Sequence, residues 1–202
     1  MTVAQRMSTP KASLSERHSD LSQRVILDAA VELLERAPVT ELSVRAIARQ
    51  AAISERTVFR YFATRDELLE AVAQDVARRL QRPPDPRSLE ELLEYPDALY
   101  KRFEANAALI QAVLHSELYH RIRNADAEHR GLAVRKLLDS LATRRSERER
   151  RLAAANIHYH ITASTWHYYR CYFGLSLDDS VECARMAIRQ AISALGVKLP
   201  GS

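Results

Sequence analysis

Apolar residues recur at three- and four-residue intervals along most of the chain, the spacing that lines one face of an α-helix. The first such stripe, with Leu21, Val25, Ala29 and Leu33, predicts a helix from about residue 20 to residue 37, where Pro38 ends it. Strand-like alternations are few, and only four of the 202 residues are glycine. This pattern predicts an all-α protein.

Two short amphipathic stretches follow, within the segment LSVRAIARQAAISERTVFRYFATRDELL that begins at Leu42. Ser43 and Ser54 stand where a hydroxyl can cap the first turn of each stretch, and a tight connection at residues 52–53 separates them. Thr64 and Glu67 have the spacing of a capping box, which predicts the start of a longer fourth helix. Two short capped helices in this order predict a helix-turn-helix.

The rest of the chain is predicted to form further helices between polar or proline-rich segments. The segment QRPPDPR at residues 81–87 ends the fourth helix and is the clearest linker. Ser88 and Glu91 open a region of at least two helices, and the polar residues 124–128 predict a loop. Later helices are expected at residues 132–141, at residues 147–173 with two apolar faces, and from Ser176 to about Leu195.

These elements predict three regions: a flexible arm at residues 1–19, a helix-turn-helix domain at residues 20–66 and a helical domain at residues 67–202. No signal-like segment is evident at the N-terminus, and no apolar run approaches the ~18 residues of a membrane span. We therefore expect a cytoplasmic protein that makes no membrane contact. Its two cysteines, Cys171 and Cys183, are expected to be buried fillers rather than a redox sensor.

Basic charge is concentrated in the helix-turn-helix. The whole chain carries 30 Lys and Arg against 26 Asp and Glu, a net charge of +4. Residues 43–65 carry five arginines and one glutamate, which is the same net charge in about a ninth of the length. Arginine suits both phosphate oxygens and guanine edges, so this segment predicts an interface with double-stranded DNA. A second basic run at residues 144–151 has acidic residues interspersed and is expected to be a solvated helix start.

The segment from Leu42 resembles the DNA-binding signature of the TetR (tetracycline repressor) family, in the order LSVRAIARQAAIS, ERTVFRYF and then a charged start to a fourth helix. The resemblance implies an all-α homodimer with an N-terminal DNA-binding domain. It also implies a C-terminal domain that binds a small molecule and dimerises through its last two helices. The candidate DNA-binding residues are Ser43, Arg45, Ser54, Arg56, Thr57, Phe59, Arg60, Tyr61 and Arg65.

Three positions depart from the family pattern. Ala52 stands where the family commonly has glycine in the turn, so either alanine adopts a left-handed backbone at some strain or the turn differs. Phe59 replaces a usual tyrosine and lacks its hydroxyl, and Arg65 replaces a usual lysine while keeping the charge. The departures leave DNA binding possible and the operator sequence open.

Aromatic and imidazole side chains gather in the C-terminal half and indicate a pocket. The candidate ligand-binding residues are Tyr100, Phe103, His115, Trp166 and Tyr169. Such a pocket suits a largely apolar ligand held by a few hydrogen bonds, although Trp166 and Tyr169 could instead form core or dimer contacts. His158 and His160 point to different faces of a helix, so no shared metal is expected. No catalytic or cofactor-binding motif is evident.

The sequence therefore predicts a homodimeric, ligand-responsive transcriptional repressor that inserts residues 54–62 of each subunit into the major groove of a palindromic operator. A small molecule bound between residues 89 and 173 would move the fourth helix and change the spacing of the two reading helices. The alternative is an all-α small-molecule-binding protein or enzyme whose N-terminal helices only pack. A DNA-binding architectural protein without a ligand is a further alternative.

Overall fold

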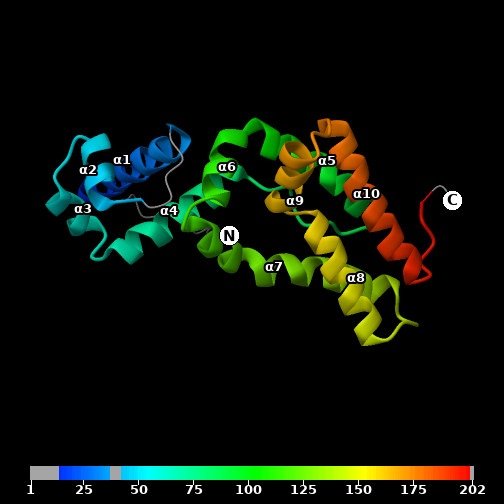
Figure 1. The fold of residues 1–202 in the computed structure, drawn as a ribbon. Coiled ribbons are helices and arrows are strands. Elements are labelled where there is room, and N and C mark those ends of the chain that lie inside the picture. The colour runs from blue at the N-terminus through cyan, green and yellow to red at the C-terminus, as the bar shows by residue number, and fades with distance from the viewer. Residues whose placement is uncertain (1–13, 37–41, 201–202) are drawn as a thin grey trace, which may run out of the picture.

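The computed structural model describes residues 14–36 and 42–200, and the side chains of residues 19–36, 42–123 and 131–200. Every regular element in these ranges is helical, which confirms the predicted all-α class. Figure 1 shows the N-terminal helices grouped at one end and joined through α4 to a larger bundle at the other. The elements are α1 (Leu14–Arg36), α2 (Val44–Gln50), α3 (Glu55–Tyr61), α4 (Arg65–Leu80), α5 (Leu89–Ala105), α6 (Ala107–Leu114), α7 (Leu118–Leu141), α8 (Glu147–His160), α9 (Ala163–His167), the π-helical turn η1 (Tyr168–Tyr172) and α10 (Leu177–Ala194).

The apolar faces of α1 to α4 pack into one hydrophobic core, which we call the N-terminal core. Its centre is formed by fully buried side chains such as Ile26 of α1, Ile47 of α2, Val58 of α3 and Leu69 of α4. Helices α6 and α7 also contribute to this core, with Leu109, Val113 and Leu118. The N-terminal helices therefore bury part of their apolar surface against the following bundle.

A second hydrophobic core, the C-terminal core, lies among α5, α8, α9, α10 and the second half of α7, and α6 contributes Ile110. Trp166 and Tyr100 are its largest fully buried side chains, and the ring of Phe103 contacts both, tilted against Trp166 at 5.9 Å between centroids and stacked on Tyr100 at 6.1 Å. Helix α5 continues through Pro96, and the region between residues 88 and 114 contains two helices divided at Asn106. This agrees with the prediction of at least two helices.

Two predicted element boundaries are wrong. Helix α1 begins at Leu14 and not near residue 20, so residues 14–19 of the expected arm are helical, while residues 1–13 lie outside the described part. Helix α7 runs without a break through residues 124–128, where a loop was expected. That stretch is polar but contains no glycine or proline and has two alanines, so its local propensity favours a helix.

The single helix expected at residues 147–173 is also wrong, because it is divided into α8, α9 and η1. The division occurs at Ile161, where the Thr162 hydroxyl accepts a hydrogen bond from the backbone N–H of Thr165 and starts α9. The Thr165 hydroxyl in turn donates to the backbone oxygen of Tyr159 at 2.5 Å. Threonine side chains that bond to nearby backbone offer an alternative to the continuing helix.

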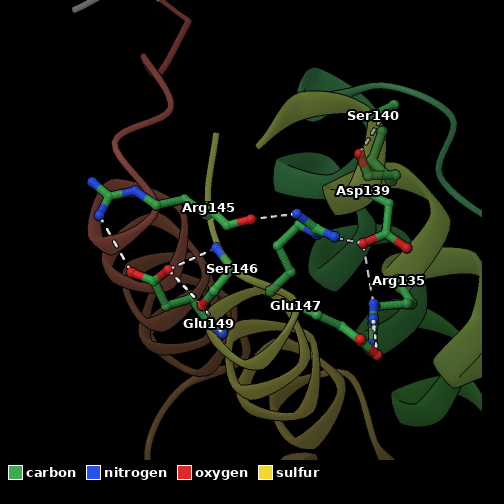
Figure 2. Close-up of polar contacts among 9 residues, drawn as sticks. Arg135, Asp139, Ser140, Arg145, Ser146, Glu147 and Glu149 are labelled. Carbon is green, nitrogen blue, oxygen red and sulfur yellow. Dashed lines mark hydrogen bonds and ion pairs between the residues drawn. The ribbon is translucent and has the colours of Figure 1, made fainter. Parts of the chain in front are cut away.

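The corner between α7 and α8 is held by a polar network (Figure 2). Ser146 and Glu149 form the predicted capping box, in which the Ser146 backbone N–H donates to the Glu149 carboxylate at 2.8 Å. Asp139 of α7 accepts from Arg150 of α8 at 2.6 Å and from Arg135 at 3.1 Å. These hydrogen bonds fix the direction in which α8 leaves α7, and the basic run is a helix start, as expected.

Candidate nucleic-acid interface and ligand cavity

Helix α3 is positioned by its capped start and by a single buried side chain. The Ser54 hydroxyl accepts from the backbone N–H of Thr57 at 3.1 Å, and the Ser43 hydroxyl caps α2 in the same way through Ala46. Val58 is fully buried, whereas Arg56, Phe59 and Arg60 are exposed. The helix is therefore anchored by Val58 and by the half-buried Thr57 and Tyr61, and its other side chains are exposed.

The turn between α2 and α3 uses the left-handed backbone conformation. Ala52 has φ = 54°, one of two non-glycine residues with positive φ in the described part of the chain. The backbone N–H of the next residue, Ile53, returns to the backbone oxygen of Ala48 at 3.0 Å and closes the end of α2. Alanine therefore carries the geometry usually given to glycine, which confirms the first of the two alternatives for this turn.

Two further candidate residues of α3 bind each other. Arg60 donates to the Tyr61 hydroxyl at 3.0 Å, and its guanidinium lies 4.9 Å from the centre of the Tyr61 ring. Hydrogen bonds from Ser22 of α1 and from Arg60 lower the pKa of the Tyr61 phenol. The pair is thus held against α1, with the polar ends of both side chains at the surface.

Arg65 differs from the other candidates because it is held by the rest of the molecule. Its guanidinium donates to the backbone oxygen of Leu42 at 3.1 Å and pairs with the carboxylate of Glu117, at the junction of α6 and α7. The same carboxylate accepts from the backbone N–H of Leu42 at 3.0 Å. Glu117 therefore binds the starts of both α2 and α4, and no sequence motif identified it.

Two more contacts attach α4 to its neighbours. Arg121 of α7 pairs with Asp66 in the first turn of α4 at 2.5 Å. Asp75 of α4 is only 1% exposed, and it pairs with Arg79 at 2.6 Å and with Arg78 at 2.9 Å. Arg79 also pairs with Asp28 of α1, so the buried carboxylate organises an ionic contact between α1 and α4.

A cavity of about 300 Å³ lies between α4, α6, α7 and the α8–α9 junction. Most of its wall is apolar, and α4 contributes Ala77 and Leu80. The polar groups in the wall include Arg82, Tyr119, Arg123 and Thr162. Residues of α4 therefore line the cavity directly, and so do residues of α7 that lie within two turns of Glu117.

Of the five predicted ligand-binding residues, only Phe103 lines this cavity. The indole of Trp166 donates to Glu104 at 3.2 Å inside the C-terminal core, and Tyr100 donates to the backbone oxygen of His160 at 2.7 Å. Tyr169 bonds the ring of His160 at 3.0 Å, and the ring of His115 packs against His167. Tyr100, His115, Trp166 and Tyr169 thus contact other parts of the protein and do not line this cavity, whose wall includes other aromatic side chains such as Tyr119 and Tyr159.

The expectation that both cysteines are buried is wrong for Cys171, which is exposed, while Cys183 is half-buried. The Cys171 sulfur lies 3.2 Å from Nδ1 of His167. Cys171 belongs to the π-helical turn η1, in which no residue is buried. Within the described ranges, no three His, Cys, Asp or Glu side chains come together to hold a metal ion, and no helix is long and apolar enough to cross a membrane.

Residues 26–72 match the family model for bacterial regulatory proteins of the tetR family. This span runs from the middle of α1 into α4 and contains both helices of the helix-turn-helix. A search of curated proteins finds no match.

The match to several solved structures extends over almost the whole of the other chain. A TetR-like transcriptional regulator from Rhodococcus sp. RHA1 has a TM-score of 0.61 at 16% identity, over 85% of this chain and 96% of the other. NalD, the secondary repressor of the MexAB-OprM multidrug efflux pump in Pseudomonas aeruginosa, has a TM-score of 0.62 at 18% identity, and the match covers 86% of this chain and 97% of NalD. A tetR-family regulator from Shewanella sp. PV-4 has a TM-score of 0.56 at 19% identity, and the match covers 82% of this chain and 97% of the other. At these identities the likeness establishes the fold.

Proposed function

Because the chain belongs, through its N-terminal helix-turn-helix, to the tetR family of bacterial regulatory proteins, we propose that it is a homodimeric repressor released from a palindromic operator by a small molecule. We further propose that residues 20–66 form the reading domain and residues 67–202 the ligand-binding and dimerisation domain, without an enzymatic activity. Of the arm predicted at residues 1–19, residues 14–19 belong to α1, and residues 1–13 lie outside the described part of the chain.

The observation that carries the proposal is the outward face of α3. Its side chains Arg56 and Phe59 are exposed and Thr57 is half-buried around one buried anchor, on a short helix whose start is capped, as a helix that enters the major groove requires. Ser43, Arg45 and Ser54 lie at the starts of α2 and α3, where exposed hydroxyl, guanidinium and backbone N–H groups suit phosphates.

The test is an electrophoretic mobility shift with DNA that flanks the protein's own gene. Thr57→Ala is expected to weaken binding at particular base pairs, and Arg56→Ala to flatten the slope of log affinity against log salt by about 1. Arg65→Ala is expected to keep the wild-type slope, because Arg65 is already bound to Glu117. Absence of binding to any such fragment at low salt would favour the non-regulatory alternative.

Coupling between the cavity and the reading helices is proposed to run through α4 and the start of α7. A ligand that fills the cavity contacts Ala77 and Leu80 of α4 and Tyr119 of α7. Two residues before Tyr119, Glu117 binds the starts of α2 and α4. A ligand that prefers a shifted α7 would therefore weaken the arrangement in which both reading helices fit one operator.

Dimerisation is proposed through α8 and α10 together with η1. Large apolar side chains are exposed on all three elements, and clustered exposure of this kind marks interaction surfaces. They are Leu152, Tyr159, Tyr168, Tyr172, Phe173 and Met186. Sedimentation analysis tests this: Tyr172→Glu is expected to shift the protein toward the monomer, and a monomeric wild type would contradict the proposal.

A further inference from the structure

We infer that Phe59 contacts the methyl group of a thymine in the major groove and so determines one base of the operator in each half-site. The inference rests on the DNA-binding function proposed above and adds the base that this residue selects. It comes from the exposure of the Phe59 ring, from the charged side chains around it, and from the groups that base pairs offer to a side chain without hydrogen-bonding atoms.

The phenyl ring of Phe59 is an apolar group on the charged outer face of α3. It is 45% exposed, whereas Phe62, just after the same helix, is 7% exposed and belongs to the N-terminal core. Glu55 and Arg56, which precede Phe59 by one helical turn, and Arg60, which follows it, are exposed as well. The ring of Phe59 therefore stands outside the core, on the face that the proposed function directs at DNA.

Two other candidate side chains of α3 are bound to the protein itself. Thr57 is half-buried, and its hydroxyl bonds that of Ser54 at 2.9 Å. Arg60 donates to the Tyr61 hydroxyl at 3.0 Å, and its guanidinium lies over the Tyr61 ring. Phe59 is thus the apolar side chain of α3 that extends furthest into solvent.

The charge around Phe59 favours nucleic acid as the partner that covers its ring. Residues 43–65 carry five arginines and one glutamate, a net charge of +4. Of these arginines, Arg45 and Arg49 of α2 and Arg56 of α3 are exposed. An apolar ring among exposed positive charges is complementary to a polyanion that also presents an apolar group. Double-stranded DNA combines both, through its phosphates and through the thymine methyl groups in its major groove.

The thymine methyl is the group in the major groove that suits a phenyl ring. Guanine, adenine and cytosine present hydrogen-bond acceptors or donors there, whereas thymine presents its C5-methyl group beside an acceptor. A phenyl ring placed on a donor, an acceptor or a phosphate displaces water without replacing the lost hydrogen bond, which is unfavourable. Placed on the methyl group, it buries apolar surface on both partners. Phe59 is therefore expected to select a T·A pair at the position that its ring reaches.

The test replaces thymine by deoxyuridine, which lacks only the methyl group. The site that the full-length protein protects is first located by footprinting on DNA that flanks its own gene. Each thymine of that site is then replaced in turn, and the affinity is measured by mobility shift. For the wild type, replacement of one particular thymine in a half-site is expected to weaken binding about fourfold, the effect of one buried methyl group.

Variants assign the methyl contact to Phe59. Phe59→Ala is expected to bind the thymine and deoxyuridine fragments equally, so that the ratio of the two affinities falls from about four to about one. Phe59→Leu keeps an apolar side chain and is expected to give a ratio of about two. Val25→Ala is the matched control, because Val25 is an apolar residue of α1 with a similar exposure of 48%. It is expected to keep the wild-type ratio.

Three outcomes would overturn the inference: no thymine at which deoxyuridine weakens binding, a ratio of about four that persists in Phe59→Ala, or a ratio that is lost in Thr57→Ala instead. If Phe59→Ala binds too weakly for a ratio to be measured, an undiminished ratio in Phe59→Leu overturns it equally. In each of these cases the wild type still binds the fragment, so the proposed DNA-binding function stands. A wild type that binds no such fragment at low salt contradicts both the function and the inference.

Discussion

Replacement of Ala52 by glycine is expected to stabilise the protein. Alanine at φ = 54° is in the left-handed region, which costs an L-residue about 1–2 kcal/mol, whereas glycine adopts it without a steric penalty. Glycine also gains freedom in the unfolded chain, which removes about 0.4–1 kcal/mol of stability. The side chain of Ala52 is exposed, so deletion of its methyl group loses no buried contact. The net gain is about 0.5–1 kcal/mol, or an increase in Tm of about 2 °C for a chain of this size.

The assay is urea and thermal unfolding followed by circular dichroism at one fixed protein concentration, because association changes apparent stability. Ala51→Gly is the matched control. Ala51 is the preceding residue, in the right-handed region at φ = −76°, where glycine is expected to cost about 0.5–1 kcal/mol. If Ala52→Gly destabilised the protein as much as Ala51→Gly does, the left-handed turn could not be the cause of strain at this position.

Three further changes test other contacts. Glu117→Gln is expected to lower the free energy of unfolding by about 1 kcal/mol, since its ion pair with Arg65 is partly exposed, and an unchanged urea midpoint would argue against the link. Asp75→Asn removes a buried carboxylate whose arginine partners reach solvent, so the free energy of unfolding is expected to fall by about 2 kcal/mol. Asp28 is more exposed, and Asp28→Asn is expected to lower the free energy of unfolding by less than about 1 kcal/mol. The hydrogen bond from Arg170 lowers the pKa of Glu104, so its contribution is present above the ordinary glutamate pKa of about 4.3 and is lost as the pH falls toward the lower folded value. Glu104→Gln is therefore expected to be less stable than wild type at pH 7 and to approach it in acid, and equal differences at both pH values would contradict this.

The helix-turn-helix could be predicted because its determinants are local. The side chains of Ser43, Ser54 and Thr64 each cap a helix by accepting from the backbone N–H three residues further on. The left-handed backbone of Ala52 was likewise one of the two alternatives indicated by its position in the turn of the motif. Hydroxyl caps and turn geometry depend on neighbours in the chain, so a sequence pattern is enough to find them.

The cavity and the link between the domains could not be predicted in the same way. Arg82 and Tyr119 line the same cavity although 37 positions separate them in the sequence, and Glu117 contacts Leu42 from 75 positions away. Trp166 was a candidate because of its residue type, but its indole is satisfied by Glu104 inside the core. Whether an aromatic side chain lines a cavity or fills an interface depends on the packing of several helices, which periodicity along one helix does not specify.

Helix α6 has only eight residues, yet it belongs to both hydrophobic cores, with Leu109 and Val113 in the N-terminal core and Ile110 in the C-terminal core. A helix of this length has little stability alone, so disordering either core would remove one of its two supports. The proposed reading domain and the bundle are therefore expected to unfold as one cooperative unit. An N-terminal fragment that ends at the proline-rich linker would lack Leu109, Val113 and Leu118 of the N-terminal core. The reading domain is therefore not a module that could be moved intact onto another protein.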